Sequence, residues 1–287
     1  MASRAEAGAA AGAAASVPAE GSAHRTHAAG TTCDCTHLAP ESVPLALADL
    51  HRSLALHSRV AVHASALTWP TQRLDDVVIG AGFEVDTIDV SPGSNDMAPG
   101  SDPPLLTVGA RRAESLPDTV GADMRLLISG LNPSPAATDA GVGFFRPGNR
   151  FWPATIAAGL ATRDRDPLDA LHRHGVGMTD LVKRTTRRAD ELSADEYRAG
   201  VARLDRMCEW LQPEAVCLVG LAGWRAAVDR RAVAGWQERR LGGRPVYVMP
   251  STSGLNAATT KDELVDHLRA AASAAPAVGG QADRRPT

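Results

Sequence analysis

The chain has 287 residues, of which 44% are hydrophobic and 22% are charged. This composition excludes a wholly disordered chain and allows a buried core in one or two domains. The formal net charge of −3 argues against a surface that is strongly positive throughout. The charge is uneven, however, because residues 121–270 hold 21 Lys and Arg against 18 Asp and Glu, whereas the remainder holds 9 against 15. The excess of +3 therefore leaves an anionic ligand open for the central region.

Several other classes of protein are excluded in the same way. No apolar run reaches the roughly 18 residues of a transmembrane helix, so no membrane span or membrane partner is expected. The alanine-rich start carries charges and lacks an apolar signal core, so secretion is not expected. Cys33 and Cys35 with His37 are arranged as a metal site could be, but no second cysteine pair follows at a suitable spacing. We expect free thiols in a reducing, cytoplasmic compartment, and no metal or other cofactor.

The first half of the chain is predicted in three parts. Residues 1–42 are rich in Ala, Gly, Ser and Pro and are predicted to be a disordered tail, as are residues 274–287. The accessory segment 43–117 is predicted to hold helices over 45–54 and 74–81 and strands over 60–63, 83–90 and 105–108. Residues 80–85 read Gly-Ala-Gly-Phe-Glu-Val and resemble the C-terminal end of class I methyltransferases. No glycine-rich cofactor loop precedes them, so the segment is interpreted as a structural remnant or accessory lobe.

From residue 118 to 273 the pattern predicts one regular domain. Buried strands are expected over 124–129, 215–219 and 245–249, and helices over 150–160, 166–172, 193–212, 224–232 and 260–272. Ser193 with Glu196 and Thr260 with Glu263 form capping boxes that open two of these helices. Strands that alternate with helices predict a three-layer α/β/α sandwich with a mainly parallel central sheet. Ligands of such sheets bind beyond the C-terminal ends of the strands.

The loops at the predicted strand ends carry the unusual residues. Asn132 precedes a proline after the first strand, where its amide can hold a water molecule or simply form a turn. Phe144 and Phe145 are half of all phenylalanines in the chain and lie in one loop. They can stack on a planar base or plug the core beneath the loop.

Two further loops contain cations, hydroxyl groups and an isolated apolar residue. Lys183, Arg184, Arg187 and Arg188 suit phosphate groups, although a solvated charge run is the commoner case. Thr179 and Asp180, just before them, can cap or line a pocket. Residues 249–257 read Met-Pro-Ser-Thr-Ser-Gly-Leu-Asn-Ala, whose backbone amides can bind phosphate. Leu255 in this loop can wedge into a base stack or pack against the last helix.

Together, four segments resemble the mismatch-specific uracil/thymine-DNA glycosylase family of the uracil-DNA glycosylase superfamily. They are residues 130–133, 143–152, 177–186 and 249–256, and the resemblance covers roughly residues 118–272. Each motif alone is weak, whereas all four in order at strand ends are specific. The chain departs from the family pattern at Ser134, where a glycine is usual, and at Ala257, where some members have arginine.

The resemblance implies a role for each matching position. Asn132 would position the hydrolytic water, and Thr179 would help to hold the water or the base. Phe144 would stack on the extruded base, and Leu255 would replace that base in the helix. With the cation cluster included, the expected sites are as follows: catalytic Asn132 and Thr179; base-binding Gly130, Leu131, Ser134 and Phe144; and DNA-binding Lys183, Arg184, Arg187, Ser251, Ser253, Gly254, Leu255 and Asn256.

The implied activity is excision of uracil, and of thymine or modified cytosine, mispaired with guanine in double-stranded DNA, by a monomer. A mismatched base costs least to extrude from the stack. Because the amide of Asn132 cannot act as a general base, we expect a dissociative, metal-free hydrolysis that is slower than in relatives with aspartate there. Two alternatives stay open: a glycosylase for hypoxanthine or xanthine, and a non-catalytic module that binds mismatched DNA.

Overall fold

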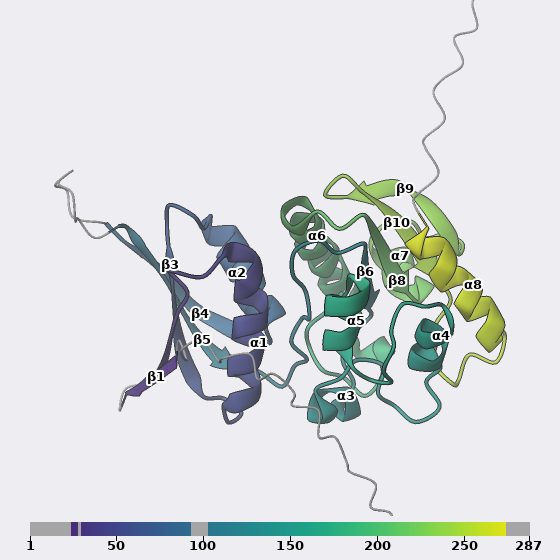
Figure 1. Cartoon of the computed structure of the whole chain (residues 1–287), viewed down its shortest axis with the longest axis horizontal. Coiled ribbons are helices and arrows are strands. Elements are labelled where there is room, and N and C mark those ends of the chain that lie inside the picture. The colour runs from purple at the N-terminus through teal and green to yellow at the C-terminus, as the bar shows by residue number, and fades with distance from the viewer. Residues whose placement is uncertain (1–23, 28–29, 93–102, 274–287) are drawn as a thin grey trace, which may run out of the picture.

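The computed structural model describes residues 24–27, 30–92 and 103–273. They form two α/β lobes that lie side by side, each built on its own five-stranded sheet (Figure 1). We call residues 24–112 the N-terminal lobe, residues 124–273 the C-terminal lobe, and residues 113–123 the linker. Among the described helices, none is both long and apolar enough to cross a membrane.

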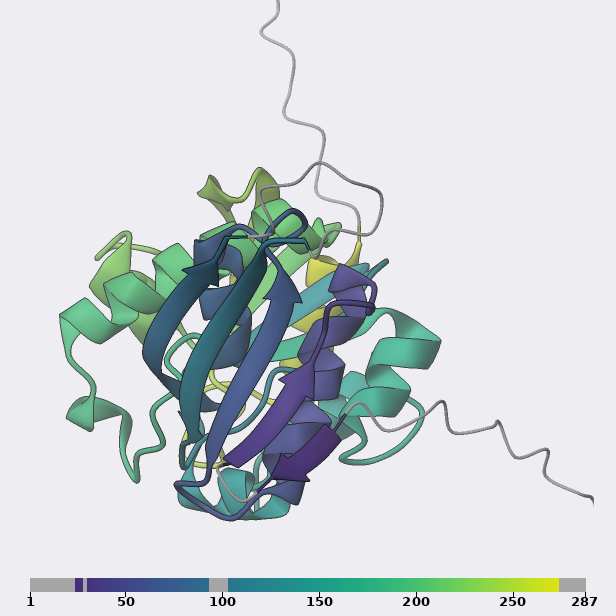
Figure 2. The same cartoon turned by 90° about the vertical axis from the view of Figure 1, so that its left-hand side faces the viewer.

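The N-terminal lobe is a sheet covered by two helices on one face. Its strand order is β1-β2-β3-β5-β4, in which β2 and β3 are parallel and β5 runs antiparallel to both of its neighbours. Figure 2 shows the strands in front and the helices behind them, so no helix of the described residues covers the other face of the sheet. The elements are β1 (His24–His27), β2 (Gly30–Asp34), η1 (Pro40–Ser42), α1 (Val43–Ser53), β3 (Arg59–Ser65), α2 (Thr71–Gly80), β4 (Phe83–Ser91) and β5 (Leu105–Arg112).

The sequence predicts the elements of 43–112 correctly, but the disorder predicted for residues 30–42 is wrong. These residues form β2, which pairs with β3, and the short helix η1. Cys33 and Cys35 lie on the buried face of this segment as free thiols and join the core under α1. Their burial stabilises a segment whose average composition is typical of a tail. Residues 1–23 and 274–287, also predicted to be disordered, lie outside the described residues.

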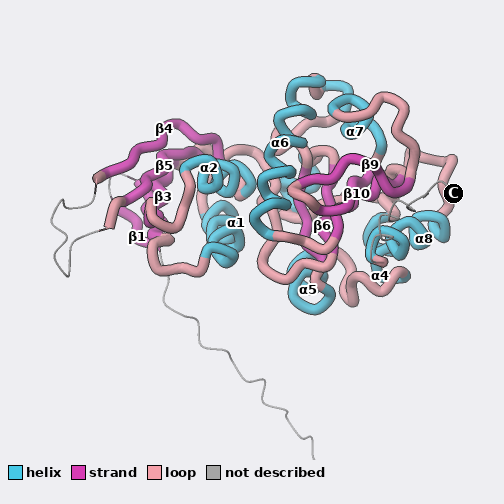
Figure 3. The backbone as a smooth tube through the Cα atoms, turned by 90° about the horizontal axis from the view of Figure 1, so that it is seen from above, coloured by secondary structure: helices cyan, strands magenta, loops and turns pink. Residues whose placement is uncertain are grey.

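The C-terminal lobe confirms the predicted three-layer sandwich. Its strand order is β7-β6-β8-β10-β9, and every pairing is parallel except that of β9 with β10. Helices α6 and α7 cover one face of the sheet and α4, α5 and α8 cover the other (Figure 3). The strands are β6 (Leu126–Gly130), β7 (Val176–Asp180), β8 (Ala215–Val219), β9 (Gly235–Leu241) and β10 (Arg244–Met249). The helices are α3 (Pro135–Ala140), α4 (Phe151–Ala157), α5 (Pro167–His174), η2 (Ala189–Glu191), α6 (Ala194–Leu211), α7 (Leu221–Ala227) and α8 (Lys261–Ala272).

Local signals explain most of these boundaries. Both capping boxes are present, since Ser193 accepts from the backbone of Glu196 and Thr260 from that of Glu263. Strands β7 and β9 and the short helices α3 and η2 were not predicted. β9 is an edge strand whose exposed charges hide any alternation of apolar residues, and α3 spans only six residues within a loop. Helix α7 ends at residue 227, earlier than predicted.

The two lobes contact each other through α2 and α6. Arg206 of α6 donates two hydrogen bonds of 2.6 and 2.8 Å to the Asp76 carboxylate of α2. Beside this ion pair, the rings of Trp69 and Trp210 meet edge to face with their centroids 5.4 Å apart. Helix α6 therefore packs on the central sheet of its own lobe and also on the neighbouring lobe.

Gly200 lets α6 approach the end of β7. A β-carbon at this position would overlap the carbonyl oxygen of Leu181. Replacing glycine by alanine inside a helix normally stabilises it by about 1 kcal/mol. We expect Gly200→Ala to do the opposite and to lower the free energy of unfolding by about 1–3 kcal/mol, because backbone atoms would have to move apart. Urea unfolding measures the change.

The reverse substitution at exposed Ala199 serves as the control. Ala199→Gly should cost about 1 kcal/mol through helix propensity alone. An unfolding free energy that rises for Gly200→Ala would contradict the close approach described here.

Candidate active site

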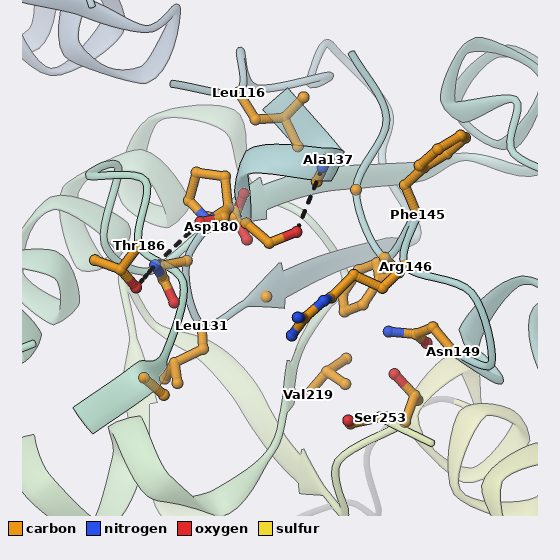
Figure 4. A pocket seen from close by; sticks show the side chains of 18 of the residues that line it. Leu116, Leu131, Ala137, Phe145, Arg146, Asn149, Asp180, Thr186, Val219 and Ser253 are labelled. Carbon is orange, nitrogen blue, oxygen red and sulfur yellow. Dashed lines mark hydrogen bonds between the residues drawn. The ribbon is translucent and has the colours of Figure 1, made fainter. Parts of the chain in front are cut away.

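The loops singled out in the sequence meet at one cavity of about 200 Å³. It lies beyond the C-terminal ends of the central parallel strands, where α/β sheets commonly bind ligands. Residues 130–134, 143–146, 186–189 and 251–253 supply most of its wall, and Leu116 of the linker closes one side. Figure 4 shows Asp180 and Leu131 on one side of this space and Asn149 and Ser253 on another, with the side chain of Arg146 pointing between them.

Backbone pairing brings the first and third motifs together. The amide of Leu181 donates to the carbonyl of Gly130, and that of Val182 donates to Leu131, both at 2.9 Å. Farther along, the amide of Thr186 donates to the carbonyl of Pro133 at 3.1 Å. The parallel pairing of β6 with β7 therefore continues past the sheet edge and fixes one loop against the other.

Asn132 is held in a single orientation within this pairing. Its side-chain amide nitrogen donates to the carbonyls of Pro133 and Arg184, both at 3.1 Å, and to the Thr186 hydroxyl at 2.7 Å. Carbonyl oxygens can only accept, so the nitrogen and oxygen of this amide cannot exchange places. The Oδ1 atom is left as the acceptor that Asn132 can offer to a molecule in the cavity, as the sequence suggested for a bound water.

Asp180, which the sequence left open as a capping or pocket-lining residue, was not among the expected catalytic or binding residues. It ends β7 opposite Gly130, and its carboxylate lies over the Cα atom of that glycine. A β-carbon at residue 130 would overlap Asp180 Oδ1, so only glycine leaves room for the carboxylate. Asp180 lines the cavity, is only 8% exposed, and makes no side-chain hydrogen bond with the described residues. The signal available in the sequence was a carboxylate at the end of the short stretch 176–180, which was not predicted to be a strand.

The environment of Asp180 favours its neutral form more than water does. Burial raises the pKa of its carboxyl group to about 6, although the ammonium group of Lys183 works against the rise. The negative charge of Asp118 adds to it, and the guanidinium of Arg203 opposes it. A carboxyl group with such a pKa can exchange a proton near neutral pH, which is the property of a general acid or base.

Phe144 lines the cavity in an unusual backbone conformation. Its φ angle is +59°, a value that side-chain-bearing residues rarely adopt. One face of its ring is stacked on Phe151, with centroids 3.9 Å apart and planes 17° from parallel. The neighbouring Phe145 ring is covered by the guanidinium of Arg165 at 5.0 Å. Phe144 therefore combines the two roles that the sequence left open, since it packs on the core and also borders the cavity.

Thr179, the second predicted catalytic residue, does not line this cavity. It lines a smaller adjoining space of about 20 Å³ together with Phe144 and Asp180. Its hydroxyl is buried, donates to Asp118 Oδ1 at 2.6 Å and accepts from Arg203 at 3.0 Å. Successive side chains of a strand point to opposite faces, and the Thr179 hydroxyl turns toward Asp118 and Arg203 while Asp180 lines the cavity. Thr179 lies instead in the polar cluster behind β7.

The predicted cation cluster divides into paired and unpaired members. The side chain of Lys183 is 10% exposed and pairs with Asp118 at 2.7 Å, so its charge is already neutralised within the protein. Arg184 donates to both oxygens of Glu196, and this contact lowers the pKa of Glu196 to about 2. Arg188 pairs with Asp190 in the same way. Within the described part of the chain, Arg187 and Arg146 at the cavity wall have no ion pair.

The loop between β10 and α8 exposes one apolar side chain, and hydrogen bonds from Arg150 support the rest of the loop. Leu255 is 91% exposed, which agrees with a wedge and rules out packing against α8. Arg150, unnoticed in the sequence, supports the loop through the carbonyls of Ser253, Asn256 and Thr259. Asn256 donates its side-chain amide nitrogen to the Ser251 carbonyl at 2.8 Å and to the Thr259 hydroxyl at 3.2 Å, so this nitrogen stabilises the loop itself.

The remaining predicted positions lie at or beside the cavity. Gly130, Leu131 and Ser134 line it, and the Ser134 hydroxyl also caps α3. Ser251 and Ser253 line it from the opposite side. Gly254 lies against the backbone of Gly148, where a β-carbon would be 2.8 Å from a carbonyl oxygen. Across the described residues, no three His, Cys, Asp or Glu side chains are grouped as metal ligands would be.

Two comparisons relate this chain to known proteins. The family model of the uracil DNA glycosylase superfamily matches residues 117–273, which include all four loops. Among solved structures, the solution NMR structure of a candidate uracil DNA glycosylase from Methanosarcina acetivorans matches with a TM-score of 0.40 and 20% identity. That match covers 54% of this chain and 95% of the other, and at this TM-score it carries no argument of its own.

The two buried aspartates beside β7 should affect stability with opposite signs. The raised pKa of Asp180 means that its ionised form destabilises the fold, so Asp180→Asn should add about 2–3 kcal/mol to the unfolding free energy at pH 8. The gain should shrink as the pH falls through about 6 and vanish below the ordinary aspartate pKa near 4. Thermal or urea unfolding against pH measures it.

Asp118→Asn is the matched control. Burial alone would raise the pKa of Asp118, but Lys183 and Arg203 hold it below its usual value. Its ionised form therefore stabilises the fold above pH 4, and that variant should lose stability at pH 8. A gain for Asp180→Asn that does not depend on pH would contradict this description of the site.

Proposed function

Because its family model spans more than half of the chain, the protein belongs to the uracil DNA glycosylase superfamily, and we propose that it excises uracil mispaired with guanine in double-stranded DNA. Thymine and modified cytosine opposite guanine are the weaker substrates. The observation that carries the proposal is the locked amide of Asn132, whose Oδ1 atom is the acceptor left for a water molecule in the cavity. Excision begins base excision repair by leaving an abasic site.

The first step is extrusion of the base, for which the exposed tip at Leu255 is suited. A flipped base leaves a gap in the stack, and an apolar side chain can fill that gap. Leu255 lies at the edge of a groove formed with residues 146, 147 and 149, adjacent to the cavity. Extrusion costs a few kcal/mol and least for a mispaired base, which favours a G·U pair over A·U.

The extruded base would be held by stacking and by the cavity wall. Phe144 borders the space, and its ring cannot turn away because Phe151 covers its other face. Gly130 and Leu131 lie below it at the strand end. Stacking on an aromatic ring contributes about 1–3 kcal/mol per base and tolerates any pyrimidine. Discrimination between pyrimidine bases must then come from polar groups of the cavity wall and from how readily each base acts as a leaving group.

The reaction is hydrolysis of the bond between the sugar C1′ and the base nitrogen. As that bond breaks, its electron pair goes to the base and positive charge develops on the sugar. Asn132 Oδ1 accepts a hydrogen bond from the attacking water, whose oxygen forms the new bond to C1′. The water proton passes to the Asp180 carboxylate, which is ionised above its pKa of about 6. In this proposal Asn132 orients the water and Asp180 supplies the base that an amide cannot.

Contacts to the DNA backbone would come from the unpaired cations and the last loop. Arg187 and Arg146 approach the cavity from different loops, so they can meet the phosphates on either side of one extruded nucleotide. The hydroxyl groups of Ser251 and Ser253 lie on the same rim. With two such arginines among the described residues, binding should depend modestly on salt.

Removing the amide of Asn132 tests the proposal directly. We expect Asn132→Ala to lower the single-turnover excision of uracil from a G·U duplex by about 100–10,000-fold, because the water loses its orientation. Asn132→Asp should also fail, since a carboxylate would face the carbonyl oxygens of Pro133 and Arg184. Strand cleavage after alkali treatment of labelled duplexes measures the rate.

Binding to duplex DNA that contains an abasic-site analogue is the control, and both variants should bind it as the wild type does. The substrate panel contains G·U, G·T, A·U, hypoxanthine opposite thymine, and single-stranded uracil. The proposal requires the highest rate on G·U. Undiminished excision by Asn132→Ala would refute the assigned role, and no cleavage of any substrate by the wild type would favour a binding module.

Leu255 should matter for duplex DNA alone. Leu255→Ala is expected to slow excision from a G·U duplex by about 10–100-fold, because nothing then replaces the extruded base. Excision from single-stranded DNA should change little, since no base pair has to be broken there. The same rate measurement on the two substrates decides the matter.

Leu67→Ala provides a matched control, because this leucine is 77% exposed and lies on the N-terminal lobe. Neither substitution should change stability by more than about 0.5 kcal/mol, as both side chains are at the surface. Equal losses on duplex and single-stranded DNA would show that Leu255 is not a wedge.

A further inference from the structure

The linker is bonded to both lobes at once. The amide of Asp118 donates to the carbonyl of Gly80, the last residue of α2, at 2.9 Å. The next residue, Thr119, exchanges two backbone hydrogen bonds of 2.8 Å with Met178 in β7. Two adjacent residues therefore connect the end of α2 to the strand that carries Asp180.

The side chain of Asp118 strengthens this connection. Its carboxylate is buried and accepts from the Lys183 ammonium at 2.7 Å, the Thr179 hydroxyl at 2.6 Å and the Arg203 guanidinium at 2.9 Å. Arg203 in turn donates to the backbone carbonyl of Asp180 at 2.9 Å. A single linker carboxylate thus holds the residues on both sides of Asp180 as well as the arginine that bonds to it.

The N-terminal lobe packs directly on this cluster. A β-carbon on Gly80 would overlap Asp118 Oδ2 and would lie 3.0 Å from Arg203 Nη1. The contact continues along the same two helices to the ion pair between Asp76 and Arg206. The end of α2 therefore lies against the cluster with no room for even one methyl group between them.

We propose that the N-terminal lobe braces the active site, and that Asp118 is the positioning residue through which α2 holds the end of β7 and the Asp180 carboxylate in place. This rests on the function proposed above, in which Asp180 takes the proton of the attacking water. The linker also supplies Leu116 to the cavity wall, and the Lys183 ammonium donates to its carbonyl. The lobe thus supports both the shape of the cavity and its reactive group.

The charges around Asp180 determine how a displacement of Asp118 would change the pH at which Asp180 ionises. The groups that face Asp180 are Lys183 from its own segment, Asp118 from the linker and Arg203 from α6. Asp118 opposes ionisation of Asp180, whereas Lys183 and Arg203 favour it. When Asp118 moves away, the two cations are no longer neutralised, so Asp180 should ionise at lower pH. A purely structural role of the lobe would weaken the fold without moving this ionisation.

Gly80→Ala tests the brace, because its methyl group must push Asp118 and Arg203 aside. The increase in unfolding free energy caused by Asp180→Asn is measured as a function of pH, once in the wild-type protein and once in the Gly80→Ala protein. The pH at the midpoint of this curve reports the ionisation of Asp180. We expect Gly80→Ala to move this midpoint down by about half to one pH unit. Single-turnover excision from G·U should fall about 10–100-fold, with its acid limb shifted in the same direction.

Gly109→Ala is the matched control. It lies in the same lobe, and its β-carbon would be 2.7 Å from the Thr87 side chain, away from the linker. It should leave the midpoint and the excision rate unchanged. The proposal would be overturned if the midpoint pH in the Gly80→Ala protein equalled that of the wild type. It would also be overturned if Gly109→Ala moved the midpoint by the same amount as Gly80→Ala.

Asp118→Asn is the second variant if Gly80→Ala does not fold. It keeps the shape of the side chain and removes its charge, and it should also move the midpoint downward; an unmoved midpoint refutes the brace. The stability readout does not depend on excision. A wild-type protein that excises no base would therefore refute the proposed function, while the midpoint would still decide the role of the lobe.

Discussion

The contact between Asp180 and Gly130 is the constraint from which the rest of the site follows. The two residues are paired across β6 and β7, and the carboxylate occupies the space where any side chain on residue 130 would begin. This register places the residues that follow each strand side by side, which is why Asn132 finds its partners at residues 184 and 186. A shift of one residue would turn Asp180 away from the cavity and separate Asn132 from its partners at residues 184 and 186.

Two buried aspartates near the end of β7 have opposite effects on stability because their surroundings differ. Asp118 takes the nearby cations, is fully hydrogen-bonded and contributes to stability. Asp180 keeps no side-chain partner among the described residues and costs stability when it ionises. Such a cost is typical of functional sites, where a reactive group is held in a strained or unpaired state by surroundings that are well bonded. Helix α6 belongs to those surroundings, and the N-terminal lobe packs against that helix.

Much of the fold is readable from local patterns. Apolar strands and two capping boxes predicted the alternating sandwich, and the loops that were singled out do meet at one cavity. The site residues are harder to predict from the sequence where their roles depend on contacts between distant segments. Lys183 belongs to a run of cations that suggests phosphate, yet Asp118, 65 residues earlier, neutralises it. Thr179 and Asp180 are neighbours in sequence, and only the strand register decides which of them faces the cavity.

The first lobe shows the same limit on a larger scale. Residues 30–42 have the composition of a tail, and their order comes from two buried cysteines and from pairing with a later strand. The role of Arg150 likewise gives no signal in the sequence. This arginine donates hydrogen bonds to three carbonyls of a loop about a hundred residues away. Propensity and periodicity describe neighbours along the chain, whereas these roles arise from neighbours in space.

The central claim is that the cavity holds a carboxylate able to exchange a proton near neutral pH. Carbon-13 NMR of protein labelled at the aspartate carboxyl carbons tests it most directly, with Asp180→Asn used to assign the resonance. The account predicts that Asp180 titrates with a pKa of about 6 in the free protein, while Asp118 stays ionised to well below the usual range. A resonance of Asp180 that titrates near 4, as an exposed aspartate does, would contradict the account.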